Sequence, residues 1–391
     1  MTVNGTFATV ANARHETVKR WKEETGKKVI GYFTGVAPEE ILFAGDVLPV
    51  RITGTGEPLE LADQHLAGNT CPFARSCLDA GMRGDYHYLD GVVIPNTCDV
   101  VFYMHDLWSD LVPRSTKPSF VLGEDLNPYV YYINYPEKVT GRAVVPFYTE
   151  VLKGFKQKLE RSLKRSITDD DLGRSIGVYN AHHQQMRRMY DLRKKNPPAL
   201  SGYEAWQIAF SSLFMPKDQH TELLKEHLDD LEAVGDSGSN GVRIYLSGSA
   251  MDAVNSHIIK VIEESGGVVV SDDLCVGTRS FWGGLDPELD PLEAIARRSL
   301  SVASPSVTED EDIPELRWGH IKATTEDFDV QGAVFLIMKC CDARNSEYPH
   351  LRDKLSEERD VPALFLEGDY TVEGIEQMRG RVEAFVEMIE G

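Results

Sequence analysis

The sequence predicts an α/β protein with two parallel-sheet domains and a helical segment between them. Two observations support this fold class. Short apolar runs alternate with helical patterns in the first and last thirds of the chain, whereas the middle third has long periodic helices and no strand pattern. Strands that alternate with helices are typical of a parallel sheet covered on both faces, as in flavodoxin-like and Rossmann-like domains. We therefore predict an N-terminal α/β domain at 1–145, a helical segment at 146–238 and a C-terminal α/β domain at 239–391.

Four apolar runs in the N-terminal third predict strands, at Lys28–Phe33, Leu48–Ile52, Leu89–Pro95 and Ser119–Leu122. Helices are expected between them at Pro38–Gly45, Pro72–Gly81 and Val100–Leu111. The first of these helices has a proline near its start and two glutamates in its first turn, where the helix dipole favours acidic side chains.

The middle third is expected to form four helices, at Tyr148–Arg165, Thr168–Lys195, Tyr203–Phe214 and Gln219–Val234. Capping residues at Ser166–Asp169 precede the second helix. The turn residues Asp236–Gly241 then indicate a domain boundary, because glycine, serine, asparagine and aspartate favour loops.

The last third returns to alternation. Strands are predicted at Val242–Ser247, Gly267–Val270, Gly332–Met338 and Ala363–Leu366. Helices are predicted near Ala253–Glu264, Pro291–Ser301, Tyr348–Glu357 and Val372–Glu390, and the acidic stretch Val307–Pro314 is expected to be a surface loop.

The composition excludes some classes of partner. The chain has 391 residues and a net charge of −21, so its surface should repel nucleic acid and anionic membranes. No apolar run approaches the roughly 20 residues that span a bilayer. The N-terminal residues also lack the pattern of a secretory signal. We expect a cytoplasmic protein that binds neither nucleic acid nor membranes, with its six cysteines reduced.

Three cysteines lie where predicted strands end or helices begin. Cys98 and Cys341 each follow a strand and precede an aspartate, and Cys71 opens a helix at a Cys-Pro step. Helix N-termini favour thiolates, and parallel strands gather functional groups at their carboxyl ends. Three remote thiolates without a histidine partner suit a cubane iron–sulfur cluster with one non-protein ligand. Buried structural thiols are the alternative on spacing alone.

The other cysteines are assigned to packing. Cys340 and Cys341 are adjacent and point to opposite faces in an extended chain, and Cys341 beside Asp342 is the better ligand. Cys77 lies six residues after Cys71 in a helix, so the two side chains point apart. Cys275 follows a strand end, and we assign it to packing, although it could line the cleft between the domains.

Several other motifs are rejected as sites. Gly54–Gly56 begins a dinucleotide fingerprint but lacks the third glycine, and no P-loop motif occurs, so direct ATP binding is not expected. His182 and His183 are expected on a solvated helix face rather than on a metal. The same is expected of a basic run that could otherwise meet phosphates or a partner subunit: Arg187, Arg188, Arg193, Lys194 and Lys195.

Five segments together resemble one family. They are the strand and helix start at Gly31–Leu42, the cysteine motifs Cys71–Ser76, Leu89–Asp99 and Met338–Asp342, and the segment Asp272–Arg279. Through these segments the chain resembles the benzoyl-CoA reductase/2-hydroxyacyl-CoA dehydratase family, and specifically its iron–sulfur (D-component) subunit. The resemblance extends from about residue 18 to 388.

The resemblance implies one [4Fe–4S] cluster bound by Cys71, Cys98 and Cys341. It also implies a related second iron–sulfur subunit in a heterodimer, and a separate activator protein that hydrolyses ATP to deliver a low-potential electron. The implied substrate is an acyl-CoA thioester that reacts through a ketyl radical. The polar groups expected near that cleft are Thr34, Glu57, Asp99 and Ser249.

Two activities share this scaffold. The Asp272–Arg279 segment, followed by Phe281 and Trp282, favours benzoyl-CoA reductase-type reduction slightly over a 2-hydroxyacyl-CoA dehydratase, which is a lyase. A non-catalytic accessory protein and a double-cubane-type reductase are further alternatives. The presence of all three cysteine positions disfavours a non-catalytic accessory protein. The sequences around Cys71 and Cys98 fit the family members that act on acyl-CoA better than they fit a double-cubane-type reductase.

Overall fold

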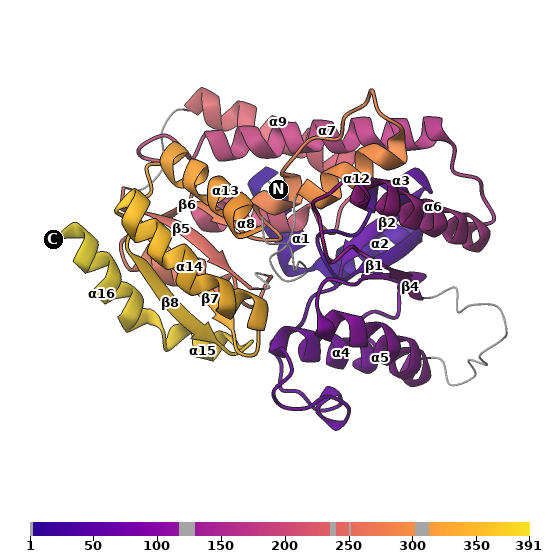
Figure 1. The fold of residues 1–391 in the computed structure, drawn as a ribbon, viewed down its shortest axis with the longest axis horizontal. Coiled ribbons are helices and arrows are strands. Elements are labelled where there is room, and N and C mark those ends of the chain that lie inside the picture. The colour runs from indigo at the N-terminus through magenta and orange to yellow at the C-terminus, as the bar shows by residue number, and fades with distance from the viewer. Residues whose placement is uncertain (1–2, 117–129, 235–239, 250–251, 302–312) are drawn as a thin grey trace.

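The computed structural model describes residues 3–116, 130–234, 240–249, 252–301 and 313–391 (Figure 1). It contains two four-stranded sheets, and every strand pair in them is parallel. The first has the order β2-β1-β3-β4 and consists of β1 (Lys28–Tyr32), β2 (Val47–Arg51), β3 (Gly91–Pro95) and β4 (Val130–Ile133). The second has the order β6-β5-β7-β8 and consists of β5 (Val242–Gly248), β6 (Gly267–Asp273), β7 (Gly332–Met338) and β8 (Ala363–Gly368). The predicted α/β fold class with two parallel sheets is confirmed.

Helices cover both sheets. The N-terminal part contains α1 (Val3–Asn12), α2 (Arg14–Thr25), α3 (Glu39–Ala44), the 3-10 turn η1 (Ala62–Gln64), α4 (Pro72–Arg83) and α5 (Asp99–Thr116). The middle contains α6 (Val144–Leu163), α7 (Asp169–Asp191), α8 (Gly202–Ser211) and α9 (Lys217–Val234). The last part contains α10 (His257–Glu264), α11 (Thr278–Phe281), α12 (Pro291–Ser301), α13 (Ile313–Asp327), α14 (Asp342–Arg359), α15 (Val372–Glu376) and α16 (Arg379–Glu390).

Most predicted elements occur within a few residues of their expected bounds. The strand predicted at Ser119–Leu122 lies outside the described residues, and the fourth strand is β4 at Val130–Ile133. Helices α1, α2 and α13 were not predicted, because their apolar residues do not form a long periodic stripe. Helix α13 begins at Ile313, so the end of the predicted acidic loop is helical, while 307–312 lie outside the described residues.

The solvated face predicted for α7 is wrong for its two histidines. His182 and His183 are both buried, and His182 Nε2 lies 3.2 Å from His220 Nδ1 on α9. Arg193, placed in the solvated basic run, is also buried and donates to the Val269 carbonyl oxygen of β6. Helix α7 packs against α3, α9 and α12, so the side that carries the two histidines is covered, whereas its opposite side stays exposed.

The helical segment ties the two sheets together. Helices α7 and α9 lie along the upper side of the molecule in Figure 1, and α8 packs against β6. Helix α12 packs on α6, and the Tyr135 hydroxyl donates to the Ser299 carbonyl oxygen at 3.1 Å. Helix α1, at the N-terminal end of the chain, packs on α8 and α9 of the middle segment. These packing contacts between the middle helices and both ends of the chain fix the orientation of one sheet relative to the other.

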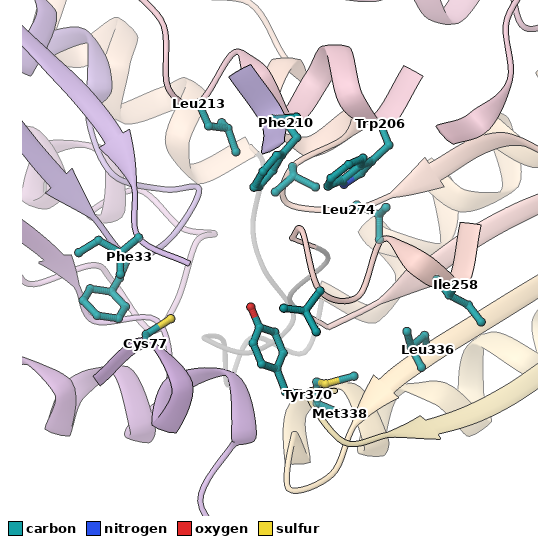
Figure 2. Packing of buried hydrophobic residues seen from close by; sticks show 14 of the residues in the cluster. Phe33, Cys77, Trp206, Phe210, Leu213, Ile258, Leu274, Leu336, Met338 and Tyr370 are labelled. Carbon is teal, nitrogen blue, oxygen red and sulfur yellow. The ribbon is translucent and has the colours of Figure 1, made fainter. Parts of the chain in front are cut away.

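One hydrophobic cluster runs through both halves. It contains Phe33 and Cys77 from the N-terminal part and Leu336 and Met338 from β7. Figure 2 shows Tyr370 reaching between these two groups of side chains. Because burial of apolar surface is the main stabilising term in folding, this shared core holds the two halves in contact.

Candidate functional site

The carboxyl ends of the two sheets face each other. Arg51 is the last residue of β2, and its Nη2 lies 3.7 Å from Sγ of Cys275, which follows β6. The Gly54 amide, just after β2, donates to the Tyr370 hydroxyl after β8 at 3.1 Å. These contacts place the strand ends, where parallel sheets gather functional groups, on a common interface.

Three helices present their N-termini to this interface, each with a cysteine. Cys71 is the N-cap of α4, Cys98 directly precedes α5, and Cys341 is the N-cap of α14. The first two come from the N-terminal half and the third follows β7 of the second sheet. All three are free and half-buried, so each thiol combines contact with the interior and some access to solvent.

The three thiols influence one another electrostatically. The pKa of Cys71 is raised to about 12, chiefly by burial and in part by Cys341 and Cys98, while the backbone amides of Ala74 and Phe73 oppose the shift. Burial likewise raises the pKa of Cys98, and Cys341 adds to the rise. Cys341 of the second half therefore acts electrostatically on both cysteines of the first half.

The donor set is compatible with a cluster. Within the described part of the chain, no group of three or more histidine, cysteine, aspartate or glutamate side chains surrounds a point that could hold a single metal ion. Zinc needs thiolates about 2.3 Å from one centre, whereas an iron–sulfur cluster takes thiolates on different irons. Soft sulfur donors at helix ends are the type of ligand that iron–sulfur clusters use.

The adjacent pair Cys340 and Cys341 differs sharply in environment. Cys340 is exposed and has a left-handed backbone with φ of 59°, which non-glycine residues rarely adopt. Cys341 packs against the shared hydrophobic cluster. The turn at Cys340 therefore directs Cys341 inward, which agrees with the choice of Cys341.

Cys77 and Cys275 differ as well. Cys77 is fully buried in the shared core, and burial raises its thiol pKa well above the usual value. Cys275 is half-buried at the interface, beside the Arg51 guanidinium. The packing role of Cys77 is evident, whereas Cys275 faces a charged group.

The predicted polar residues are spread over the interface. The Thr34 hydroxyl oxygen, just after β1, is buried and makes no hydrogen bond to any residue that the structure describes. Ser249 is buried at the end of β5, where its hydroxyl accepts from the Met338 amide at 3.4 Å. Glu57 and Asp99 are exposed, the first on the loop after β2 and the second at the start of α5. Thr34 is thus the one of these four with a buried polar atom left unpaired.

A buried polar cluster across the interface was not predicted. The Tyr370 hydroxyl donates to Asp252 and accepts from the Gly54 amide, and Ser76 accepts from the Thr55 amide. Burial raises the pKa of Asp252 to about 6, although the Tyr370 hydroxyl and Arg14 favour its charged form. The residues are too far apart in sequence for any local pattern to reveal this cluster.

A second unpredicted cluster lies at the end of β6. Asp273 is fully buried and forms ion pairs with Arg317 at 2.6 Å, Arg344 at 3.3 Å and Arg279 at 3.4 Å. Glu347 pairs with Arg317 and Arg344. Arg344 lies in the first turn of α14, and its amide donates to the Cys341 carbonyl oxygen at 3.1 Å. This cluster therefore anchors the helix end that carries Cys341.

The described residues include no helix long and apolar enough to cross a membrane.

The chain is similar to known proteins over nearly its whole length. Residues 34–389 match the model of the family described as 2-hydroxyglutaryl-CoA dehydratase, D-component. The chain is 27% identical to a benzoyl-CoA reductase subunit of Thauera aromatica, over 88% of this chain and 87% of the relative. It is 24% identical to the (R)-phenyllactyl-CoA dehydratase beta subunit of Clostridium sporogenes, over 98% of this chain and 97% of the relative. It is 23% identical to the beta subunit of (R)-2-hydroxyglutaryl-CoA dehydratase of Acidaminococcus fermentans, over 98% of each chain.

The family match covers nearly the whole chain, and the relatives are named as subunits of reductases and dehydratases. The resemblance drawn from the cysteine motifs is confirmed. The chain belongs to the benzoyl-CoA reductase/2-hydroxyacyl-CoA dehydratase family and is a component of an enzyme.

Proposed function

We propose that this chain binds one [4Fe–4S] cluster through Cys71, Cys98 and Cys341 and is the iron–sulfur subunit of an enzyme that acts on an acyl-CoA thioester. The observation that supports the proposal is that each of the three cysteines lies at a helix N-terminus and that Cys341 influences the other two electrostatically. A bound cluster would supply a low-potential electron, and the thioester would react as a ketyl radical.

The protein's own groups support this chemistry in two ways. Backbone amides beside Cys71 and Cys98 favour the thiolate form, which offsets part of the cost of burying negative sulfur. Thr34, Glu57 and Ser249 are the polar groups that we propose around the reacting carbonyl. Thr34 has the strongest support, because its buried hydroxyl has no hydrogen-bond partner within the described structure.

The proposed enzyme needs partners. The relatives are named as subunits, which supports a partner chain, and we propose that this partner is a related second iron–sulfur subunit in a heterodimer. The sequence contains no P-loop motif, so we assign ATP hydrolysis to a separate activator protein.

We favour benzoyl-CoA reductase-type reduction, because the relative with 27% identity is a benzoyl-CoA reductase subunit. A 2-hydroxyacyl-CoA dehydratase is the second candidate, supported by the family description and by the two dehydratase relatives. Counting electrons per turnover with the activator, ATP and acyl-CoA thioesters separates them. A reductase consumes electrons in proportion to product, whereas a dehydratase recycles its electron.

The cluster assignment is tested by anaerobic purification with iron and sulfide analysis. About four irons per chain are expected in the wild type, with absorbance that oxygen bleaches. Replacing Cys98 by Ser should remove the cluster. Replacing the fully buried Cys77 by Ala is the matched control and should leave the iron content unchanged. Iron retained by all three single variants of Cys71, Cys98 and Cys341 would refute the proposal.

A further inference from the structure

Arg51 carries a buried charge that the protein does not neutralise. Arg51 is the last residue of β2 and is only 6% exposed. In the described part of the chain, no carboxylate forms an ion pair with it. Its Nη2 faces Cys275 Sγ at 3.7 Å, and its guanidinium lies 5.6 Å from the ring centroid of Tyr32. A thiol is a weak acceptor and a ring face compensates a charge only modestly, so this guanidinium lacks an anion.

A second guanidinium close to Cys275 is also undercompensated. Arg279 has one ion pair, with Asp273 at 3.4 Å, and that carboxylate is shared with Arg317 and Arg344. Burial lowers the pKa of Arg279 and the nearby Arg344 lowers it further, whereas Asp273 and a charge on Cys275 raise it. Positive charge therefore exceeds negative charge on both sides of Cys275.

The surrounding groups suit a small anion. Thr34, on the turn after β1, has a buried hydroxyl without a hydrogen-bond partner. The next residue, Gly35, comes close to both sides of the interface, because a methyl group on it would lie 3.6 Å from the Cys275 carbonyl oxygen and 3.9 Å from Arg51 Nη1. Elements from both halves thus surround one unpaired guanidinium.

We propose that Arg51 and Arg279 bind an oxyanion of the acyl-CoA ligand at this interface. The inference rests on the proposed function, since an acyl-CoA carries phosphates and some acyl groups carry a second carboxylate. Arginine is suited to both, because its planar fork pairs in a bidentate manner with carboxylate and phosphate. The ligand would then supply the negative charge that the free protein lacks.

The test variant is Arg51→Met, made in the full chain purified anaerobically. A buried charge without a partner is costly, so this change should leave the ligand-free melting temperature no lower than that of the wild type. Glutarate and inorganic phosphate serve as probes of the two sources. An anion that binds the native state raises the melting temperature of the wild type, and this rise should be lost in the variant.

Acyl-CoA binding then identifies the source. If the site takes an acyl carboxylate, Arg51→Met should weaken glutaryl-CoA about 10- to 100-fold and leave butyryl-CoA unchanged. If it takes a CoA phosphate, both thioesters should weaken together. Gly35→Ala is a second variant that adds a methyl group beside Arg51 without a steric clash, and it should also reduce anion binding.

The matched control is Arg243→Met. Arg243 is equally buried but donates to the carbonyl oxygens of Phe328 at 2.8 Å, Lys195 at 3.1 Å and Arg193 at 3.1 Å. Its loss should lower the melting temperature and leave the response to anions intact. The inference would be overturned if neither glutarate nor phosphate raised the melting temperature of the wild type. It would also be overturned if the anions raised the melting temperature of the Arg51→Met variant as much as that of the wild type. Iron content, measured in the same samples, reports separately on the cluster.

Discussion

Replacing Asp273 by Asn should be among the most damaging single changes in the chain. Asp273 has no exposed surface and lies between the guanidiniums of Arg317, Arg344 and Arg279. Asparagine has nearly the same shape but no charge, so the change removes the central anion while the cations stay buried. Glu347 then remains as the partner of Arg317 and Arg344, and Arg279 loses its ion pair.

The magnitude follows from these contacts. Removing one partner of a buried ion pair costs about 3–5 kcal/mol, and a protein of this kind has a total stability of about 5–15 kcal/mol. Burial alone opposes ionisation of Asp273, but Arg317, Arg279 and Arg344 hold its pKa well below its usual range. A lowered pKa contributes stability above the unfolded value of about 4 and loses it as the pH falls. The cost of the substitution should therefore be constant between pH 6 and 8.

Urea denaturation followed by far-UV circular dichroism and tryptophan fluorescence measures this cost. Trp318 is buried directly after Arg317, so fluorescence reports on the region of the cluster. The double variant Asp273→Asn with Arg317→Met should recover part of the lost stability, because it also removes an uncompensated cation. Since Arg344 lies three residues after Cys341, the single variant should also bind less iron.

Two results would refute this reasoning. A single variant within about 1 kcal/mol of the wild type would mean that the arginines find other compensation, because a broken buried pair costs several times more. A double variant less stable than the single one would mean that packing of Arg317, rather than its charge, supports the region.

Three further predictions concern the turn before α14 and the interdomain contacts. Cys340→Gly should keep the iron content and stay within about 1 kcal/mol of the wild type, because glycine accepts the left-handed backbone at this position; loss of iron would assign the ligand to Cys340 instead. Gly54→Ala should cost about 1–3 kcal/mol in urea denaturation, because its methyl carbon would lie 2.5 Å from Cε1 of Tyr370; an unchanged midpoint would contradict the tight contact. As the pH rises from 5.5 to 7.5, the Asp252→Asn variant should become more stable relative to the wild type by roughly 1 kcal/mol. The reason is that the pKa of Asp252 is raised to about 6 in the folded state, so the wild type loses stability as this carboxyl ionises. Unfolding free energies of variant and wild type that change in parallel with pH would show that Asp252 titrates normally.

The sequence by itself determined the α/β class, seven of the eight strands and the positions of the three cysteines at helix starts. These features are local, because apolar periodicity, capping residues and a Cys-Pro step can be read within a few residues. The same locality explains the errors. His182 and His183 look polar and exposed on an isolated helix, but α9 and α12 cover that helix from distant parts of the chain.

Only the tertiary structure decided which groups meet between the sheets. Cys341 acts electrostatically on Cys71 and Cys98 because the carboxyl ends of the two sheets face each other, and the packing of α12 and α1 on the middle helices holds that orientation. The same arrangement buries Arg51 without an ion pair among the described residues and encloses Asp273 among three arginines. Charge compensation in a protein interior depends on distances between residues remote in sequence, and the interior's low polarity makes those distances decisive.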